Sequence, residues 1–435
     1  MAACARCTRH GVAAARCASR NRTHCRHFRG SSNMARIAVV GAGVVGVATS
    51  YMLCKAGHSV TLIDRNGKPG EGVSRRNGAQ LSYGYGDALA SPGLLAVIPE
   101  ILAGRDPAYR FRLQADPEFL IWGLRFLGSC LSSRFEANTR YLLEMAEHTR
   151  QILQELLSEF SLSFDYDVAG KMLLYPSEVF FEKGARVRAM KKAMGFRLEE
   201  LDRTAATCIE PALDAYRDPI GRVEYCPDDA VGRPDRFCET LVEGLVQRYG
   251  LRRHLGREAR RIRSHNGAVT GLIFATDDPI DCDAVVVATG YETSLLPFMD
   301  RPRGGLWPIQ GYSFTAQRTK RSMRVSITDV KRKLVFARIG EEVRVAGLAD
   351  IGARQVAFDP LRFDSLKSSS LEAFVDAFQP IADDKPWTEG RPCTPSSRPI
   401  VRPGSLSGLY LNLGHGGLGW TLCLGSAATL LRYFP

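Results

Sequence analysis

A glycine-rich turn between an apolar strand and a helix constrains the fold of this 435-residue chain more than any other feature. Ile37 to Val40 read as a buried strand, and Gly41-Ala42-Gly43-Val44-Val45-Gly46 follows directly. In such a turn the first glycine permits the sharp bend, the second lets a pyrophosphate approach the backbone, and the third lets helix and strand pack closely. The sequence therefore predicts a βαβ unit that binds a dinucleotide.

An acidic residue in the right place supports this interpretation. The predicted helix runs from Val44 to Ala56, and the next strand from Ser59 to Ile63. Asp64 follows that strand, where a carboxylate can hold a ribose diol, and the helix N-terminus offers amide donors to the phosphates. From this unit the predicted cofactor-binding residues are Val40, Gly41, Gly43, Val44, Val45, Gly46, Asp64 and Arg65.

The remaining patterns predict two interleaved parts. Helical spacing marks residues 118–131, 135–160 and 368–378, and a last helix from about residue 416. Strands are predicted at 171–175, 268–275, 284–288 and 409–413, and the alternating segments 312–316, 334–339 and 343–347 indicate an antiparallel sheet. We expect an α/β fold in which a Rossmann-like domain (34–95, 220–300 and 390–435) is interleaved with an antiparallel-sheet α+β substrate domain (96–219 and 301–389).

The first 33 residues differ from the rest, with seven arginines and no acid. Three interpretations stay open. The leader lies outside the folded protein and Met34 is the working start; or it is an organelle transit peptide; or Cys4, Cys7, Cys17, His24 and Cys25 bind a metal, although their spacing fits no established ligand pattern.

Composition excludes several classes. No apolar run of the sequence reaches the roughly 18–20 residues that span a bilayer. The eight cysteines after the leader are scattered, which favours a reducing, cytosolic compartment. No metal-ligand cluster or serine-nucleophile elbow occurs in the body of the chain. The formal net charge of +12 belongs largely to the leader, so we expect no nucleic-acid partner.

Two further segments narrow the cofactor. Ser74-Arg-Arg-Asn-Gly-Ala-Gln-Leu-Ser82 resembles the second signature of amine-oxidising flavoproteins, in which small polar residues lie along the flavin. Asp283-Ala-Val-Val-Val-Ala-Thr-Gly290 resembles the later strand of FAD folds. The resemblance implies FAD, and it adds as cofactor-binding residues Ser74, Asn77, Gly78, Gln80, Leu81, Ala288, Thr289 and Gly290.

The C-terminal segments extend the likeness. Together with Pro308–Ser313 and Trp387–Pro395, the stretch Leu411–Thr421 resembles the FAD-dependent D-amino-acid dehydrogenases of bacteria, within the glycine oxidase and D-amino-acid oxidase superfamily. The similarity covers about residues 34–425. It implies that Arg391 pairs with a substrate carboxylate, that Tyr312 adds a hydrogen bond, and that His415 touches the flavin or substrate or else stabilises its turn. The implied flavin-facing residues are Gly414, Gly416, Gly417, Leu418, Gly419, Trp420 and Thr421.

The implied reaction is hydride transfer from the substrate Cα to flavin N5, giving a 2-oxo acid and ammonia after hydrolysis. FAD is expected to be non-covalent, with Cys393 the nearest thiol, and no metal is expected. Electrons would pass to a quinone or another carrier. That would suit a cytoplasmic protein that touches the inner membrane surface without crossing it.

Two departures from the family pattern leave the substrate open. Pro395-Ser-Ser-Arg-Pro399 stands where the family has Pro-Asp-Gly-Thr-Pro, and the loop from Tyr83 to Leu89 lacks an expected tryptophan and proline. Oxidation of sarcosine, proline or hydroxyproline is therefore an alternative. An NAD(P)-dependent reductase, with Arg65 on a 2′-phosphate, and a non-catalytic protein whose leader binds nucleic acid are more distant alternatives.

Overall fold

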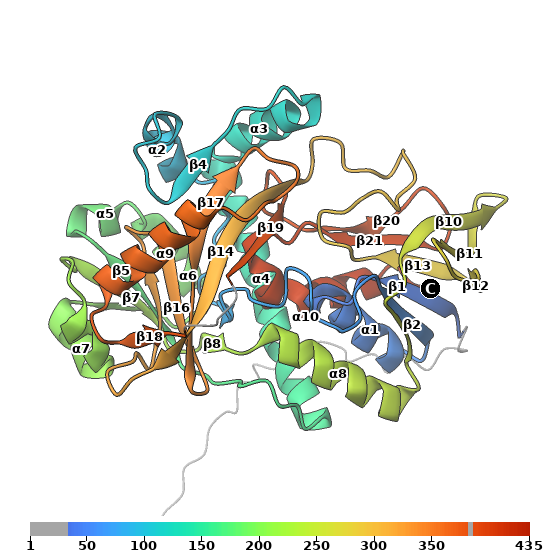
Figure 1. The fold of residues 1–435 in the computed structure, drawn as a ribbon, viewed down its shortest axis with the longest axis horizontal. Helices are drawn as coiled ribbons and strands as arrows, with labels where there is room; N and C mark the ends of the chain where they lie inside the picture. The colour runs from blue at the N-terminus through green and yellow to red at the C-terminus, as the bar shows by residue number, and fades with distance from the viewer. Residues whose placement is uncertain (1–33, 382–385) are drawn as a thin grey trace, which may run out of the picture. The chain divides into compact units, whose positions relative to one another are not determined.

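The computed structural model describes residues 34–381 and 386–435, and residues 34–435 form one compact unit (Figure 1). The three interpretations of the leader, including a metal site at Cys4, Cys7, Cys17, His24 and Cys25, concern residues outside this described part.

One half of the unit is built on a six-stranded sheet in the order β20-β21-β13-β1-β2-β9. All neighbouring strands are parallel except β20, which is antiparallel to β21. The strands are β1 (Arg36–Val40), β2 (Ser59–Asp64), β9 (Arg252–Leu255), β13 (Ala284–Val287), β20 (Ile400–Pro403) and β21 (Leu409–Leu413). Parallel strands buried on both faces are apolar throughout, which explains the unbroken apolar runs of β1 and β13.

Alternate residues of these strands enter two different cores. Ile37 and Val39 of β1 pack with helices α1 (Val44–Lys55), α4 (Ser132–Glu159), α8 (Pro234–Tyr249) and α10 (Gly419–Leu431). Ala38 and Val40 face the opposite way, against the three-stranded sheet of β10 (Ala259–His265), β11 (Ala268–Phe274) and β12 (Ile280–Asp281). The sheet is therefore covered on both faces, as expected for a Rossmann-like half.

The other half is a ten-stranded mixed sheet, on the left of Figure 1. Its strands are β4 (Tyr109–Phe111), β5 (Lys171–Tyr175), β6 (Glu199–Leu201), β7 (Arg222–Cys226), β14 (Trp307–Arg318), β15 (Ser326–Asp329), β16 (Leu334–Ile339), β17 (Glu342–Ile351), β18 (Phe378–Pro380) and β19 (Trp387–Cys393). The predicted antiparallel pairing of β14, β16 and β17 is confirmed. Two pairs, β5 with β15 and β4 with β17, are parallel and were not anticipated.

The predicted helix at 368–378 is displaced. The structure has α9 at Pro360–Ala373, because the Asp359 side chain accepts hydrogen bonds from the first-turn N–H groups of Leu361 and Arg362. A cap of this kind followed by proline starts a helix. Phe378, expected at the helix end, begins β18.

The remaining elements connect or flank the two halves. They are β3 (Gln80–Leu81), β8 (Ala230–Val231), α2 (Pro92–Leu102), α3 (Pro117–Ser129), α5 (Glu178–Glu182), α6 (Ala185–Ala193), α7 (Arg203–Ile209), and the 3-10 helices η1 (Pro211–Ala215) and η2 (Gly416–Leu418). Helix α4, expected with the substrate domain, packs in the core of α1 and α10, whereas β7, expected with the nucleotide domain, pairs with β5. The domain boundaries in detail stay a prediction.

Candidate cofactor and active site

Four segments that are distant in sequence meet at one edge of the six-stranded sheet. Val40 pairs with Ile63 and Val287, and Val287 pairs with Leu411, so the carboxyl ends of β1, β2, β13 and β21 lie side by side. Ligands of open parallel sheets bind at this edge. The predicted residues Gly41, Ala288 and Gly414 directly follow β1, β13 and β21, and Asp64 is the last residue of β2, so the topology brings them together.

Each glycine of the first turn has a different structural role. Gly41 has a φ of +111°, and a Cβ atom there would lie 2.4 Å from the carbonyl oxygen of Ala288. A Cβ at Gly46 would lie 1.7 Å from the carbonyl oxygen of Gly41, which prevents any side chain between strand and helix. At Gly43 the Cβ would meet only the Ser74 hydroxyl, at 3.0 Å. Protein packing thus requires the first and third glycines, and the second leaves the backbone open to a ligand.

Asp64 is held against this turn. Its carboxylate accepts hydrogen bonds from the backbone N–H groups of Ala42 at 2.6 Å and Asn66 at 2.8 Å. Arg65 is exposed directly after it. This arrangement fixes the carboxylate at the end of β2, where a ribose diol of a bound dinucleotide can reach it.

The segment from Ser74 to Ser82 lies between the two halves. The Ser74 hydroxyl accepts a hydrogen bond from the N–H of Val44 at 3.1 Å, and Leu81 pairs with Ala230. On the other side Gln80 donates to Ser326 of β15, and a Cβ at Gly78 would lie 3.1 Å from Val335 of β16. Asn77 turns its side chain back to the N–H of Ala79 and so shapes the segment.

The end of β13 forms a second open turn. Ala288 is buried and donates to the carbonyl of Val40 at 2.8 Å, while the Thr289 hydroxyl donates to the carbonyl of Glu292. Gly290 lies in the left-handed region, and a Cβ there would meet no atom within 4 Å. The backbone of this turn is therefore accessible next to the Gly41 turn.

The C-terminal glycine turn leads into α10 through η2. Neither α1 nor α10 has an acid in its first turn or a side chain of its N-cap residue that caps it. The N–H of Val44 at the start of α1 already donates to Ser74. The positive ends of the two helix dipoles suit an anionic or electron-rich ligand. The hydroxyl of Thr421 accepts a hydrogen bond from the N–H of Ser82 at 3.0 Å. Trp420 instead packs edge-on against Phe237, with ring centroids 4.7 Å apart, so its side chain belongs to the core.

His415 faces inward. Its Nε2 lies 2.9 Å from the hydroxyl of Ser426 in α10, and the residue forms a β-bridge with Cys393. Burial lowers the pKa of the imidazole to about 3, so the ring is neutral near pH 7. Of the two roles considered for His415, these contacts favour stabilisation of the glycine turn.

Arg391 of β19 reaches the same turn. Its Cδ atom lies 3.8 Å from the position of a Cβ on Gly417, and its guanidinium lies over Gly311 and donates to the carbonyls of Leu348 (3.0 Å) and Gly347 (3.4 Å). Burial lowers the pKa of this guanidinium. Among residues 34–381 and 386–435 no carboxylate lies within ion-pair distance of it. The half-buried cation can therefore accept an anionic ligand.

Unlike Arg391, Tyr312 has a side chain that is already bound by other residues of the protein. Its hydroxyl donates to Asp350 of β17 at 3.1 Å and accepts a hydrogen bond from the Gln310 amide at 3.0 Å. Asp350 in turn pairs with Arg110 and Arg362. The ring is fully buried in the core of the ten-stranded sheet. These contacts favour packing, the alternative to a substrate hydrogen bond from Tyr312.

A buried lysine beside this region was missed by the sequence prediction. Lys171 Nζ donates to the Ser82 hydroxyl at 2.8 Å, and burial lowers the pKa of the ammonium to about 8. The available signal was a charged residue opening the apolar strand Lys171–Tyr175. The described part of the chain holds no group of three or more His, Cys, Asp or Glu side chains placed to bind a metal.

The fold joins a Rossmann-like half to a half built on a mixed sheet, and the edge described above suits a dinucleotide cofactor. The chain belongs to the DAO family of FAD-dependent oxidoreductases, whose model matches residues 36–432. The resemblance drawn from the sequence, the fold class and FAD as cofactor are thereby confirmed.

Similar proteins and a solved structure of the same fold are consistent with this family. The chain is 37% identical over 407 residues to D-amino acid dehydrogenase 2 of Ralstonia nicotianae, covering 91% of this chain and 95% of the relative. It is 33% identical over 409 residues to the D-amino acid dehydrogenase of Dechloromonas aromatica, covering 91% and 96%. Glycine oxidase from Bacillus cereus shares the fold, with a TM-score of 0.69 and 17% identity over 91% of this chain and 93% of that one.

The residues present fit FAD. The open backbone at Gly43, the two helix N-termini without caps of their own and the carboxylate of Asp64 match a diphosphate, a flavin edge and a ribose. Cys393, the nearest thiol considered for a covalent link, is buried, and burial raises its pKa to about 12. A protonated thiol is a poor nucleophile, which agrees with non-covalent binding.

Proposed function

We propose that this chain is a D-amino-acid dehydrogenase that oxidises a D-amino acid to the 2-oxo acid and ammonia. The observation that supports this proposal most strongly is the position of Arg391. Its half-buried guanidinium lies beside the C-terminal glycine turn and has no carboxylate partner in the described chain. A planar, permanently charged donor suits a substrate carboxylate. The relatives named D-amino acid dehydrogenase support the choice of substrate class.

The chain's own residues orient the substrate, and none of them is required to remove a proton from the substrate amine. When bound, FAD supplies the acceptor for the hydride that leaves Cα. Arg391 holds the carboxylate, and the Leu348 and Gly347 carbonyls fix the guanidinium, which directs Cα–H towards the glycine turn. If the amine binds in its neutral form, loss of the hydride gives the protonated imino acid directly. His415, neutral and bound to Ser426, is then not required as a base.

Oxidation of sarcosine, proline or hydroxyproline is the less favoured alternative. The substitution at 395–399 had suggested it, but the Arg398 side chain donates to the carbonyl of Ala137 and lies 4.8 Å from the Tyr141 ring centroid, both in α4. The added cation is therefore used in packing on α4 and gives no support for a different substrate.

We infer that a quinone accepts the electrons and that α3 rests on the cytoplasmic surface of a membrane. Phe119, Trp122 and Phe126 anchor one face of α3 in the protein. Its other face exposes the apolar side chains Leu120, Ile121, Leu124 and Leu127, and Leu131, between α3 and α4, is exposed as well. No acid occurs between residues 119 and 135, whereas Arg125 and Arg134 are exposed, a pattern that suits an anionic bilayer surface. No helix of the described residues is long and apolar enough to cross a bilayer.

The proposal is tested by mixing the oxygen-free, flavin-loaded protein with D-, L- and N-methyl amino acids and following the flavin absorbance. Rapid bleaching by D-amino acids, with slow or no bleaching by L-amino acids, sarcosine and proline, is the expected result. Preferential bleaching by sarcosine, proline or hydroxyproline would establish the alternative instead.

A further inference from the structure

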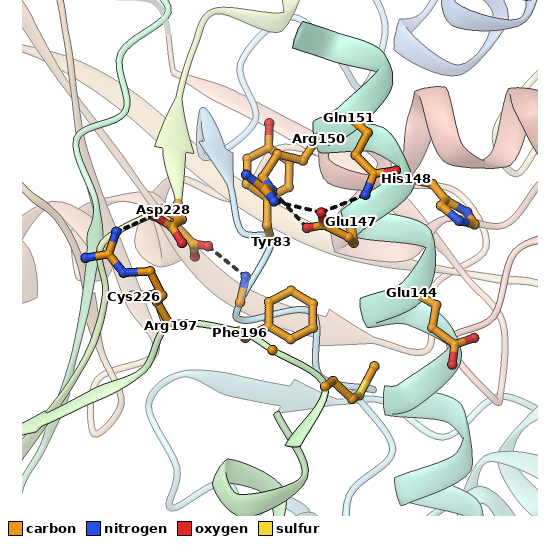
Figure 2. Close-up of a pocket in the computed structure, with 14 residues that line it drawn as sticks. Tyr83, Glu144, Glu147, His148, Arg150, Gln151, Phe196, Arg197, Cys226 and Asp228 are labelled. Atoms are coloured by element: carbon orange, nitrogen blue, oxygen red, sulfur yellow. Dashed lines mark hydrogen bonds and ion pairs between the residues drawn. The ribbon is translucent and has the colours of Figure 1, made fainter. Parts of the chain in front are cut away.

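A cavity of about 430 Å³ lies apart from the cofactor edge. Its walls are α4, the segment Met194–Arg197 after α6, the turn Cys226–Asp229 after β7, and the loop at Tyr83 and Gly84. Figure 2 shows Glu147, Arg150 and Gln151 projecting from α4 on one side, with Arg197 and Asp228 across from them. None of the residues predicted to bind cofactor or substrate lines it.

Asp229 is the unusual residue of this cavity. Its side chain is 1% exposed. One carboxylate oxygen accepts a hydrogen bond from the N–H of Gly84 at 2.7 Å, and the other has no hydrogen-bond partner in the described chain. Burial raises the pKa of this carboxyl to about 6, so it is still ionised at neutral pH. A buried carboxylate without a full set of partners is costly unless a ligand completes it.

The other charges near Asp229 already have partners. Within the cavity Glu147 is bound by Arg150 at 2.7 Å and Asp228 by Arg197 at 3.0 Å. Behind it Lys191 pairs with Asp87 at 2.9 Å and with Glu224 at 3.5 Å.

Lys171 donates to Ser82, and no ion pair to Asp229 forms in the described chain. Glu144, exposed at the rim, adds a further negative charge. The charge of Lys171 acts on Asp229 at longer range. The side chains that line the cavity are nevertheless net negative, with four carboxylates (Glu144, Glu147, Asp228 and Asp229) against two guanidiniums (Arg150 and Arg197).

We propose that this cavity is a second binding site, for a small organic cation whose ammonium group meets Asp229. Such a group supplies the donors that the free carboxylate oxygen lacks. Phe196, Met194 and Tyr83 offer apolar and aromatic surface for the carbon chain and the cation. The volume falls within the range of small-molecule sites, roughly 300–1,000 Å³. The site is independent of the substrate proposed above.

The loop that closes the cavity continues to the cofactor edge. Gly84 donates to Asp229, and two residues earlier Ser82 donates to Thr421 in the first turn of α10. A ligand bound to Asp229 therefore lies next to the segment Ser82–Gly84, which also contacts the first turn of α10 at the cofactor edge. The flavin absorption spectrum is a suitable second readout besides binding itself.

The test is calorimetric titration of the FAD-loaded protein with n-butylammonium chloride, with sodium chloride and n-butanol as controls for ionic strength and for the uncharged chain. One saturable site per chain for n-butylammonium, and none for n-butanol, is expected. Asp229→Asn keeps an acceptor for Gly84 but removes the charge. Affinity should fall about tenfold or more, because a hydrogen bond to a charged acceptor is stronger than one to a neutral acceptor.

Asp228→Asn is the matched control, because its carboxylate belongs to the same turn but is paired with Arg197, and it should bind like the wild type. Phe196→Lys places a positive charge on the half-buried wall of the cavity, where it competes with the ligand cation, and should abolish binding. This variant keeps the proposal testable if Asp229→Asn fails to fold. No saturable binding to the wild type, or equal binding by Asp229→Asn or Phe196→Lys, would overturn the proposal.

Discussion

The backbone N–H of Ser82 donates a 3.0 Å hydrogen bond to the hydroxyl of Thr421, joining segments 339 residues apart. Both groups are buried, so Thr421→Val leaves the N–H without a partner. We expect the free energy of unfolding to fall by about 1–3 kcal/mol and FAD to dissociate more readily. Thr421→Ser keeps the hydroxyl and should behave like the wild type. Denaturant titration with flavin fluorescence measures both effects, and equal stability of the two variants would refute the role of this bond.

The turn glycines should respond differently to substitution. Gly43→Val should give a folded protein without FAD, because the side chain meets only Ser74 in the protein but occupies the space of the pyrophosphate. Gly46→Val should fail to fold, because its Cβ would overlap the carbonyl oxygen of Gly41. Circular dichroism and visible absorbance per chain separate the two outcomes. Full FAD content in folded Gly43→Val would show that the cofactor lies elsewhere.

His415 should affect stability with a defined pH dependence. Its folded-state pKa of about 3 lies below the ordinary value of 6.5, so its contribution is present above about pH 6.5 and is lost as the pH falls towards 3. His415→Gln should lower stability at pH 7 and weaken this acid dependence. The kcat/KM profile between pH 5 and 8 should keep its shape. Loss of a kinetic limb in that range would make His415 a catalytic base.

Membrane contact should depend on α3. Leu124 is 71% exposed on its apolar face, and Leu124→Glu should reduce co-sedimentation with anionic phospholipid vesicles more than tenfold, since burying one leucine contributes about 1.5–3 kcal/mol. Leu361→Glu is the matched control, because Leu361 is 81% exposed on α9. An equal effect of both substitutions, or no vesicle binding by the wild type, would remove α3 as the contact.

Local patterns predicted the parts of the site that local geometry determines. Gly41, Gly46 and Asp64 follow from the demands of one βαβ turn: Gly41 has a positive φ, a Cβ on Gly46 would overlap the Gly41 carbonyl, and Asp64 accepts a hydrogen bond from Ala42. The sequence also holds a signal for the start of α9, because Asp359-Pro360 is a capping pair, whereas apolar spacing alone indicates a helix several residues later.

Contacts between distant strands were not predictable in this way. Tyr312 is bound to Asp350 because β14 pairs with β17, and nothing in the sequence near Tyr312 indicates that register. The cavity around Asp229 likewise depends on α4 meeting the turn after β7. Arg391 was found only through family resemblance, because a single arginine among turn residues carries no local signal of its own.

The most direct test of the proposed function is the anaerobic reductive half-reaction of Arg391 variants. With a D-amino acid, Arg391→Ala should reduce the second-order rate constant by roughly two to four powers of ten, since an unpaired buried charge costs about 3–5 kcal/mol. Arg391→Lys should recover part of this loss, because a point charge lacks the bidentate geometry. FAD content and melting temperature should change little.

The decisive comparison uses the corresponding alkylamine, which has no carboxylate for Arg391 to bind. Its reaction, however slow, should be equally fast in the wild type and in Arg391→Ala, so that only the amino acid loses rate. A stable, flavin-loaded Arg391→Ala protein that is reduced by D-amino acids at the wild-type rate would contradict the proposed binding of the substrate carboxylate by Arg391.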